Sequence, residues 1–505
     1  MKVRLIILSI FATFKLMGQC PEFSNTITLT SQSQVDAFVA DYPNCEELNN
    51  NLIIGHFGAP VSTDINDLSG LSPLKRVDGE LRVRNVDLLE SLEGLHNIEY
   101  VGDDLVIGDN ELLKNLSDFK HIDSLGKNFE IYNNPNLEIL FEEDSILYIG
   151  GSLNIKNNDK LTQVSGFSKL RSINGNFEIA GNTEIKTTTG FGSLEFIDGT
   201  FDISDSPQLQ NLNGFEVLTI INNGMEIRGT GITDFTGLNS LHQINGTLLG
   251  NSVAITNNLN LVSFSGLESL DSIQRSLFLI DNEHLESISG LSNLKYIGGR
   301  LSIENSSLSE IASLNGISPI TATVEISDNP NLISLDQLPL SSNIDGSLVI
   351  RDNSSLIDIT SISSVDSLFG QLNVQDNISL FDCVSLCALL TTGFVESIIT
   401  IRDNLGNCET EEDLTVLCTT STQNIIDKES IKIFPNPTES VINIEALSNI
   451  QEAAILRVDG SIVNLLQFDD STHIVNIDVS DLQIGLYFLE LVIDDIRIIK
   501  KFVKQ

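Results

Sequence analysis

One pattern, an apolar residue, any residue and a second apolar residue, recurs along most of this chain with a period of 24. Because alternate residues of a strand face the same side, each pair is typical of a short strand that buries both apolar side chains. A fixed period sustained over many copies predicts a stack of similar coils. Leu52/Ile54 is a degenerate copy, and the fourteen clear copies are Leu81/Val83, Leu105/Ile107, Phe129/Ile131, Leu153/Ile155, Phe177/Ile179, Phe201/Ile203, Met225/Ile227, Val253/Ile255, Leu277/Leu279, Leu301/Ile303, Val324/Ile326, Leu348/Ile350, Leu372/Val374 and Ile399/Ile401.

Between successive pairs, the apolar residues continue in steps of three, which in the first copy are Leu89, Leu92, Leu95, Ile98 and Val101. Gly94 and Gly102 bracket the last part of this run, which leaves room for about seven helical residues at most. A full helix in every repeat is therefore disfavoured. We predict a fold dominated by β-structure: a long parallel β-solenoid of about fourteen coils, with an apolar residue inside at each corner.

Asparagine follows the second apolar residue by three places in ten of the fourteen copies. Asparagine tolerates left-handed backbone and can bond its own turn, so stacked identical turns are expected to align these amides in a structural ladder. A row of ligand-binding asparagines is the alternative. The ten residues are Asn110, Asn134, Asn158, Asn182, Asn258, Asn282, Asn329, Asn353, Asn377 and Asn404.

The six cysteines lie only at the two ends of the repeat array, which indicates disulfide-stapled caps formed in an oxidising compartment. Cys20 is free to pair with Cys45, and the intervening sequence predicts a strand at Thr26–Thr30 and a helix capped by Ser33. At the other end, Cys383, Cys387, Cys408 and Cys418 allow three pairings, among which the sequence does not choose.

The first 18 residues have the composition of a secretory signal peptide, with Lys2 and Arg4 before the apolar run Leu5–Phe14. This run is about ten residues long, whereas a membrane-spanning helix needs ~20, so we expect no transmembrane span. We divide the chain into a signal peptide (1–18), an N-terminal cap (19–50), the repeat region with its cysteine cap (51–418), a polar linker (419–430) and a C-terminal domain (431–505).

The C-terminal domain carries short alternating strands, at Val441–Ile444 and Ala454–Val458, with Asp459-Gly460 as a hairpin turn. Leu482–Glu490 and the basic stretch up to Lys504 follow. This spacing predicts a small β-sandwich of about 75 residues.

Two resemblances add to this reading. The coil with its Gly-x-Leu-x-Ile-x-Asp-Asn core and Gly-Leu-x-x-Leu-x-x-Ile-x-Gly return, over residues 45–418, resembles the receptor L domain family of leucine-rich-repeat-like solenoids. The last 75 residues resemble the type A C-terminal sorting domain of the type IX secretion system of Bacteroidetes, on the basis of Phe434, Pro435, Asn436 and Pro437, of Gly485 and Tyr487, and of the basic tail. This second resemblance implies that residues 431–505 engage the secretion machinery, and that the protein is exported from a Gram-negative cell and is released or retained at its surface.

With 28 Lys and Arg against 69 Asp and Glu, the formal charge of −41 repels nucleic acid and anionic lipid. Outward positions of the strands are mostly polar, but Phe278 and Ile280 both point outward one coil after an insertion that contains Leu248-Leu249. This pair is the candidate ligand-binding site; the alternative is that the inserted loop folds over it.

We find no motif for a cofactor or a metal ion, and the acidic residues are spread along the array rather than concentrated in one groove. The sequence therefore predicts a secreted, cell-surface-directed and non-enzymatic recognition or adhesion protein, whose ligand is an extracellular protein or glycan. An extracellular enzyme or accessory subunit acting on polysaccharide is the alternative function.

Overall fold

The computed structural model describes residues 20–21, 26–56, 61–246, 252–421, 431–446, 449–457, 461–468, 473–493 and 496–505. The expected signal peptide, the Leu248-Leu249 insertion and the Asp459-Gly460 turn lie outside these residues. By its internal packing the chain forms two compact units, residues 1–302 with 316–318, and residues 303–315 with 319–505. Within the described residues, no helix combines the length and the apolar character that crossing a membrane requires.

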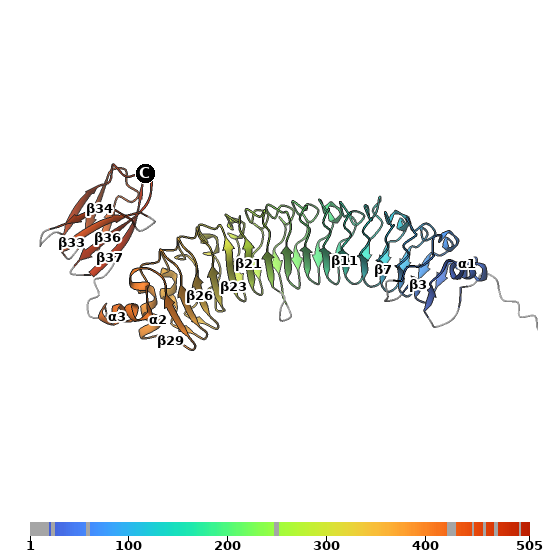
Figure 1. Ribbon diagram of the computed structural model, residues 1–505, viewed down its shortest axis with the longest axis horizontal. Helices are drawn as coiled ribbons and strands as arrows, with labels where there is room; N and C mark the ends of the chain where they lie inside the picture. Colours follow the sequence, from blue (N-terminus) through green and yellow to red (C-terminus); the bar gives the residue numbers. More distant parts are fainter. Residues whose placement is uncertain are drawn as a thin grey trace, which may run out of the picture. The chain divides into compact units, whose positions relative to one another are not determined.

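Parallel strands form the repeat region, as the period predicted (Figure 1). Each of the fourteen predicted apolar pairs, and Leu52/Ile54, lies in a strand of the first sheet. Its sixteen strands are, in order, β1 (Ile27–Leu29), β3 (Leu52–Gly55), β5 (Leu81–Arg84), β7 (Leu105–Gly108), β9 (Phe129–Tyr132), β11 (Leu153–Lys156), β13 (Phe177–Ala180), β15 (Phe201–Ser204), β17 (Met225–Arg228), β19 (Val253–Thr256), β21 (Leu277–Asn282), β23 (Leu301–Ser306), β24 (Val324–Ser327), β26 (Leu348–Arg351), β28 (Leu372–Gln375) and β30 (Ile399–Arg402).

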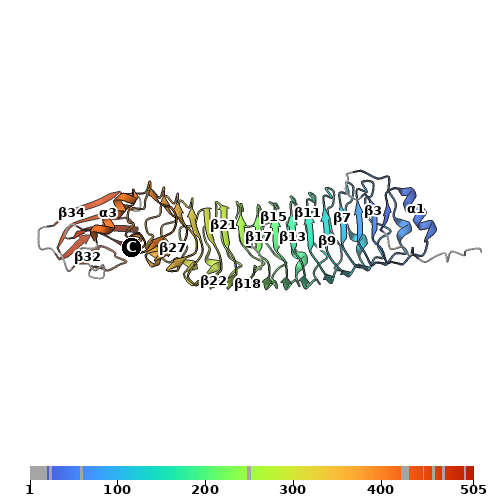
Figure 2. The ribbon, with the colours of Figure 1, turned by 90° about the horizontal axis from the view of Figure 1, so that it is seen from below.

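A second row of two-residue strands crosses the same coils, and the sequence analysis did not foresee it. Each of these strands ends on the last apolar residue of the three-residue steps, such as Val101. In the first unit its eleven strands are β2 (Glu47–Leu48), β4 (Arg76–Val77), β6 (Tyr100–Val101), β8 (Ser124–Leu125), β10 (Tyr148–Ile149), β12 (Ser172–Ile173), β14 (Phe196–Ile197), β16 (Ile220–Ile221), β18 (Gln243–Ile244), β20 (Ser272–Ile273) and β22 (Tyr296–Ile297). Figure 2 labels β18 and β22 along one margin of the coils. In the second unit the corresponding strands are β25 (Asn343–Ile344), β27 (Ser367–Leu368) and β29 (Phe394–Val395).

Within the described residues of the coils, helical structure consists of single short turns, in agreement with the glycine spacing. They are η1 (Ser69–Leu71), η2 (Ser117–Phe119), η3 (Thr189–Phe191), η4 (Ser289–Leu291), η5 (Ala312–Leu314), η6 (Thr360–Ser364), η7 (Val384–Leu386) and η8 (Gly406–Cys408). The apolar side chains of the coils are buried, including phenylalanines that stack coil on coil, such as Phe177 on Phe201 with ring centroids 5.2 Å apart.

Two successive residues shape the turn after each strand of the first sheet. In all fourteen coils the residue two places after the apolar pair has a positive φ, and it is Asn or Asp in twelve coils and glycine, Gly181 and Gly229, in the other two. The sequence analysis connected the left-handed conformation with the ladder asparagine. In the structure, the left-handed residue is instead the one that precedes it. Asn, Asp and Gly adopt this left-handed backbone conformation at low steric cost. With the turn formed at this residue, the side chain of the next residue points inward.

The asparagine ladder itself is confirmed. Asn134 Oδ1 accepts hydrogen bonds from the backbone N–H and the side-chain amide of Asn110, at 3.2 and 3.0 Å. Asn134 Nδ2 in turn donates to Asn158 Oδ1 at 3.1 Å and to the Ile107 carbonyl at 3.1 Å. These side chains are fully buried, and the ladder supplies hydrogen-bond partners to buried backbone groups.

The N-terminal cap combines a strand and a helix, as predicted. Strand β1 pairs in parallel with β3, so that Ile27 lies opposite Leu52 and the first coil is covered. Helix α1 (Gln32–Asp41) begins two residues earlier than expected, because Ser31 and not Ser33 is its N-cap: the Ser31 hydroxyl accepts a hydrogen bond from the Gln34 N–H.

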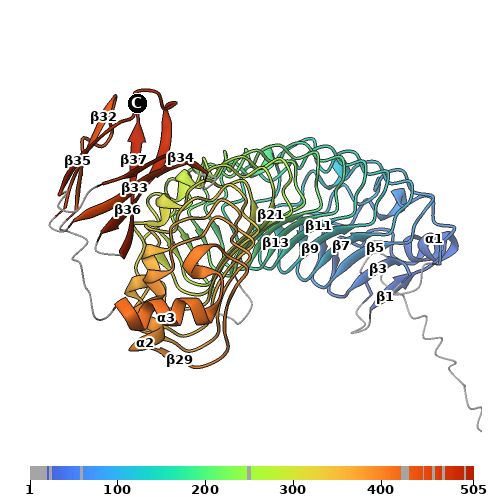
Figure 3. The same ribbon diagram turned by 60° about the vertical axis from the view of Figure 1, so that its left-hand side comes forward.

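Helices α2 (Cys387–Thr391) and α3 (Glu411–Ser421) close the C-terminal end of the coils, and Figure 3 shows them beside β29. Helix α3 includes Thr419–Ser421, so the first three residues of the predicted linker are helical. Residues 422–430 lie outside the described part of the chain.

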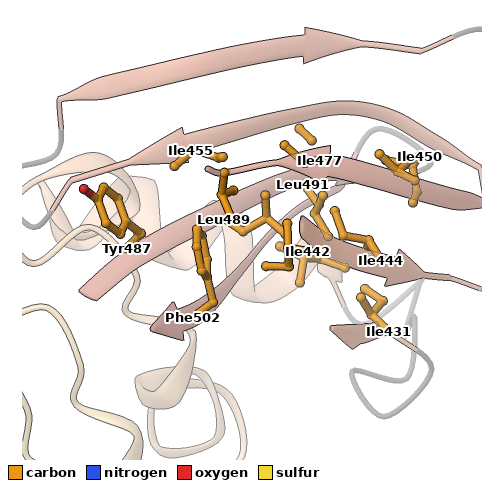
Figure 4. Packing of buried hydrophobic residues seen from close by; sticks show 14 of the residues in the cluster. Ile431, Ile442, Ile444, Ile450, Ile455, Ile477, Tyr487, Leu489, Leu491 and Phe502 are labelled. Atoms are coloured by element: carbon orange, nitrogen blue, oxygen red, sulfur yellow. The ribbon is translucent and has the colours of Figure 1, made fainter. Parts of the chain in front are cut away.

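Residues 431–505 form the predicted β-sandwich, with all strands antiparallel. One sheet has the order β31 (Lys432–Phe434), β32 (Val441–Glu445) and β35 (Ile474–Asp478); the other has the order β34 (Ile462–Gln467), β33 (Ile450–Leu456), β36 (Gly485–Ile493) and β37 (Ile496–Lys504). Figure 4 shows Ile442 and Ile444 of the first sheet packed with Leu489, Leu491 and Phe502 of the second.

Candidate binding face and sorting domain

The first sheet presents two columns of outward side chains, one for each polar position of its strands. In β13, Phe177 and Ile179 are buried whereas Glu178 and Ala180 are half-buried. The parallel register places equivalent residues of neighbouring coils side by side, so that Glu178 lies next to Asp202, and Asp202 next to Glu226. Any ligand of this face meets these columns.

Charges in these columns are largely paired with one another. Lys156 Nζ lies 2.6 Å from Glu178 Oε2, and Arg84 Nε lies 2.5 Å from Asp109 Oδ2. Arg228 bridges Asp205, at 2.7 Å, and Glu226, at 3.3 Å. The expected cross-strand pairs are therefore present, and because they are partly solvated each stabilises the sheet by only a few tenths of a kcal/mol, about 0.2–1.

Asp202 is the exception in this group. Burial raises its pKa from the ordinary 3.8 to about 6; the hydrogen bond with Ser204 opposes this rise, the neighbouring carboxylates Glu226 and Glu178 add to it, and Arg228 lowers the pKa slightly. Its Oδ1 atom is shielded from solvent and has no hydrogen-bond partner among the described residues. Asp202 is thus a carboxyl group that takes up a proton near pH 6 beside two acidic neighbours.

Phe278 and Ile280 point outward from β21, as the sequence predicted. Leu277 and Leu279 on the same strand are buried, whereas Phe278 and Ile280 are half-buried. Phe278 lies opposite Ala254 and Ile280 opposite Thr256 on β19, and the Arg300 guanidinium lies over the Phe278 ring, 5.7 Å from its centroid. The structure brings the two residues together on one face; their role in ligand binding stays a prediction.

All six cysteines are paired. The Cys20–Cys45 disulfide is the one that the sequence favoured, and it closes the N-terminal cap. Of the three arrangements left open at the other end, the structure has Cys383–Cys408 and Cys387–Cys418. The second of these disulfides joins α2 to α3, so the C-terminal cap is fastened both to the last coil and within itself.

In the sandwich, Asn436 of the Phe-Pro-Asn-Pro motif contacts the last strand. Its side-chain amide donates to the Lys501 carbonyl at 3.1 Å and accepts from the Val503 N–H at 2.9 Å. The backbone of Thr438 extends this contact, since its N–H donates to the Val503 carbonyl and its carbonyl accepts from the Gln505 N–H, both at 2.8 Å. The motif therefore fixes the C-terminal strand to the segment that enters the domain.

The other motif residues support the same region. The peptide bonds before Pro435 and Pro437 are both cis, and the Phe434 carbonyl accepts a hydrogen bond from Asn443 Nδ2. Tyr487 is buried and stacks on Phe502 with 5.7 Å between ring centroids, while Gly485 opens β36 opposite Lys504. All six motif residues thus lie around the entry segment and the last two strands.

Sequence reasoning missed the outward positions of the second sheet. An aromatic residue occupies this position at Tyr100, Tyr148, Phe196 and Tyr296, always directly before the last apolar residue of the three-residue steps. That fixed place within the repeat was the available signal.

Comparison with known proteins finds a family match for the C-terminal region. Residues 432–505 match the family model described as "Secretion system C-terminal sorting domain". The match confirms the type IX sorting domain expected at the C terminus, and indicates a secreted or cell-surface protein exported by that system and therefore in contact with its machinery.

A stretch of 69 residues is 48% identical to "Sporulation-specific protein 22" of Saccharomyces cerevisiae. The match covers 14% of this chain and 14% of the yeast protein, so the chain spans only a small part of that relative's length.

Proposed function

We propose that this chain is a non-enzymatic recognition or adhesion protein that the sorting domain directs to the outer surface of a Gram-negative cell. Its ligand is an extracellular protein or glycan. We also propose that its coils are related to receptor L domains, which fits their binding role in that family.

The observation that carries the proposal is the outward pair on β21. Several outward charges of the first sheet have charged partners, as Lys156 has Glu178 on the neighbouring strand and Arg228 has Asp205 in a turn. Phe278 and Ile280 instead present an aromatic and an aliphatic side chain on the same strand, without being buried by the residues that the structure describes. Such a pair on a polar face supports a contact with a ligand.

The purified secreted protein, applied to arrays of glycans and extracellular proteins, tests this function. We expect Phe278→Arg to weaken the binding found by about tenfold or more, because a desolvated aromatic contact is replaced by a charge. Asn154→Arg, at the equivalent position of β11, is the matched control and is expected to bind as the unaltered protein does. Equal binding by the Phe278→Arg variant would remove this pair from the site, and absence of any ligand would count against recognition.

One observation favours the alternative, an enzyme or accessory subunit that acts on polysaccharide. Glycosidases use one protonated and one ionised carboxyl group at short separation, and Asp202, with its raised pKa, lies between Glu178 and Glu226 on adjacent strands. Release of reducing ends from polysaccharides by the unaltered protein, but not by Asp202→Asn, would establish this alternative in place of the first proposal.

A further inference from the structure

Over the five strands from β6 to β14, the outward row of the second sheet alternates between aromatic residues and serine. From β4 to β14 the outward residues are, in order, Arg76, Tyr100, Ser124, Tyr148, Ser172 and Phe196. Ile220, Gln243 and Ser272 follow on β16, β18 and β20, and Tyr296 on β22. Aromatic rings therefore occupy every second strand over three successive positions, and one more position further along the sheet.

The strand register sets the distance between these rings. Tyr100 lies opposite Ser124, which lies opposite Tyr148, and Ser172 lies opposite Phe196. Because neighbouring strands are about 4.8 Å apart, rings on alternate strands repeat at about 10 Å. The serines on the intervening strands β8 and β12 carry small side chains.

The Tyr148 and Tyr296 rings lie close to the backbone that follows them, whereas the Arg76 guanidinium covers one face of the Tyr100 ring, 3.9 Å from its centroid. The Tyr148 hydroxyl accepts a hydrogen bond from Asn174 Nδ2 of the next coil at 3.2 Å. Its ring edge is so close to Gly150 that a Cβ there would come within 3.3 Å, and the Tyr296 ring stands in the same relation to Gly298, at 3.0 Å. Tyr148 nevertheless remains 45% exposed and Tyr296 41% exposed, while Tyr100 and Phe196 are half-buried, so all four side chains are at least partly accessible to a ligand.

We propose that Tyr100, Tyr148 and Phe196, here called the aromatic row, bind an extended neutral polysaccharide of the β-1,4-linked type, and that Tyr296 contacts longer chains. Aromatic faces pack against the C–H faces of pyranose rings. In a fully extended β-1,4-linked chain the same sugar face recurs every second residue, over a length close to the spacing of the row. A regularly spaced row fits a polymer with a regular repeat.

Charge selects among polysaccharides. The residues that precede the outward positions from β4 to β14 include the exposed acids Glu99, Asp123 and Glu195 and the exposed bases Lys75 and Arg171, and the whole chain carries a formal charge of −41. Carboxylates accept hydrogen bonds from sugar hydroxyls but repel uronate and sulfate groups. The complementary ligand is therefore rich in hydroxyl groups and uncharged.

This inference deepens the proposed recognition function by naming a ligand class, but it rests on another sheet, so the two can fail separately. The probes are cello- and chito-oligosaccharides from the disaccharide to the hexasaccharide, titrated calorimetrically into the full secreted chain. We expect affinity to rise with length as the ligand reaches successive rings. Tyr148→Ala, at the centre of the row, is expected to weaken hexasaccharide binding by about tenfold with an unchanged melting temperature.

A second variant tests the spacing rather than the number of rings. Tyr148→Ser combined with Ser172→Tyr keeps the composition and moves one ring by a single coil, and it is expected to bind the hexasaccharide as weakly as Tyr148→Ala. Tyr132→Ala, on the first sheet, is the control and is expected to leave binding intact.

Hexasaccharide binding that neither Tyr148 variant weakens would overturn the inference, as would no binding of either oligosaccharide series or preferential binding of a polyuronate. Oligosaccharide binding that Phe278→Arg abolishes and the Tyr148 variants leave intact would also overturn it, while supporting the site proposed on the first sheet.

Discussion

At the scale of the residue, two neighbouring residues have different roles in each turn that follows a strand of the first sheet. The first adopts the left-handed conformation, and Asn, Asp or Gly meets that demand at low cost. The second turns its side chain inward to the ladder. In coils without a ladder asparagine a hydroxyl can replace it: Thr230 and Ser306 donate to the Oδ1 atoms of Asn258 and Asn329 at 2.7 and 2.6 Å.

Removal of one ladder amide is therefore expected to be costly. Asn158 Oδ1 accepts from the backbone N–H and the side chain of Asn134, and Asn158 Nδ2 donates to the Ile131 carbonyl. Asn158→Ala leaves these groups buried without partners, and we expect the free energy of unfolding to fall by about 2–4 kcal/mol. Urea denaturation of the purified protein measures this loss.

Two variants show whether the loss comes from the ladder. Asn158→Ser retains a hydroxyl, as Thr230 and Ser306 do, and is expected to lose less stability than Asn158→Ala. Asp159→Ala, an exposed neighbour, is expected to lose almost none. Equal stability of Asn158→Ala and Asp159→Ala would contradict a stabilising ladder.

At the scale of the element, the strands of the first sheet could be predicted from the sequence, because each strand buries two apolar side chains and this pair recurs with a fixed period. The second sheet could not be predicted, since a strand of two residues such as Tyr148–Ile149 has no alternation to recognise. Only stacking of identical coils brings such short segments into register. For the same reason the only signal of the aromatic row in the sequence is the fixed place of its residues within the repeat.

Stacking also brings like charges together, and Asp202 shows the consequence. Its strand β15 lies between β13 and β17, which present Glu178 and Glu226 at the same position. Since burial and these neighbours raise its pKa to about 6, the folded protein binds a proton there more tightly than the unfolded chain does, for which the pKa is near 3.8. Stability contributed by the protonated form is present below about pH 4 and is lost as pH rises through about 6.

We therefore expect Asp202→Asn to raise the stability of the protein above pH 6, by about 1 kcal/mol once solvent screening of this half-buried group is allowed for, and to leave it unchanged at pH 4. Thermal unfolding followed across this pH range is the measurement. Glu184→Gln, an exposed acid of the same region, serves as control and should show no such pH-dependent gain. A gain for Asp202→Asn that is equal at pH 4 and pH 7 would show that the carboxyl is not titrating in this range.

At the scale of the whole molecule, the sorting domain and the proposed binding surfaces belong to separate parts of the chain. The sorting domain could be recognised from its motif, but the use of Asn436 could not, because its partners Lys501 and Val503 lie 65 and 67 residues away. The disulfide pairing at the C-terminal cap was likewise open, since four cysteines are compatible with three arrangements until the fold places Cys383 near Cys408.

Separation of these parts predicts that export and recognition can be lost independently. In the native host, deletion of residues 432–505 is expected to keep the protein inside the outer membrane, because the segment that matches the sorting family is gone. Asn436→Ala is expected to reduce export without abolishing it, since the backbone contacts of Thr438 with Val503 and Gln505 remain. Immunoblots of cell fractions and culture medium measure both effects, with Asn464→Ala on the exposed edge strand β34 as control.

The Phe278→Arg and Tyr148→Ala variants are expected outside the cell in normal amounts, because neither residue belongs to the sandwich. Export of the shortened chain at the level of the full chain would show that the sorting domain is dispensable, and retention of the Phe278 or Tyr148 variants would show that the coils also take part in export.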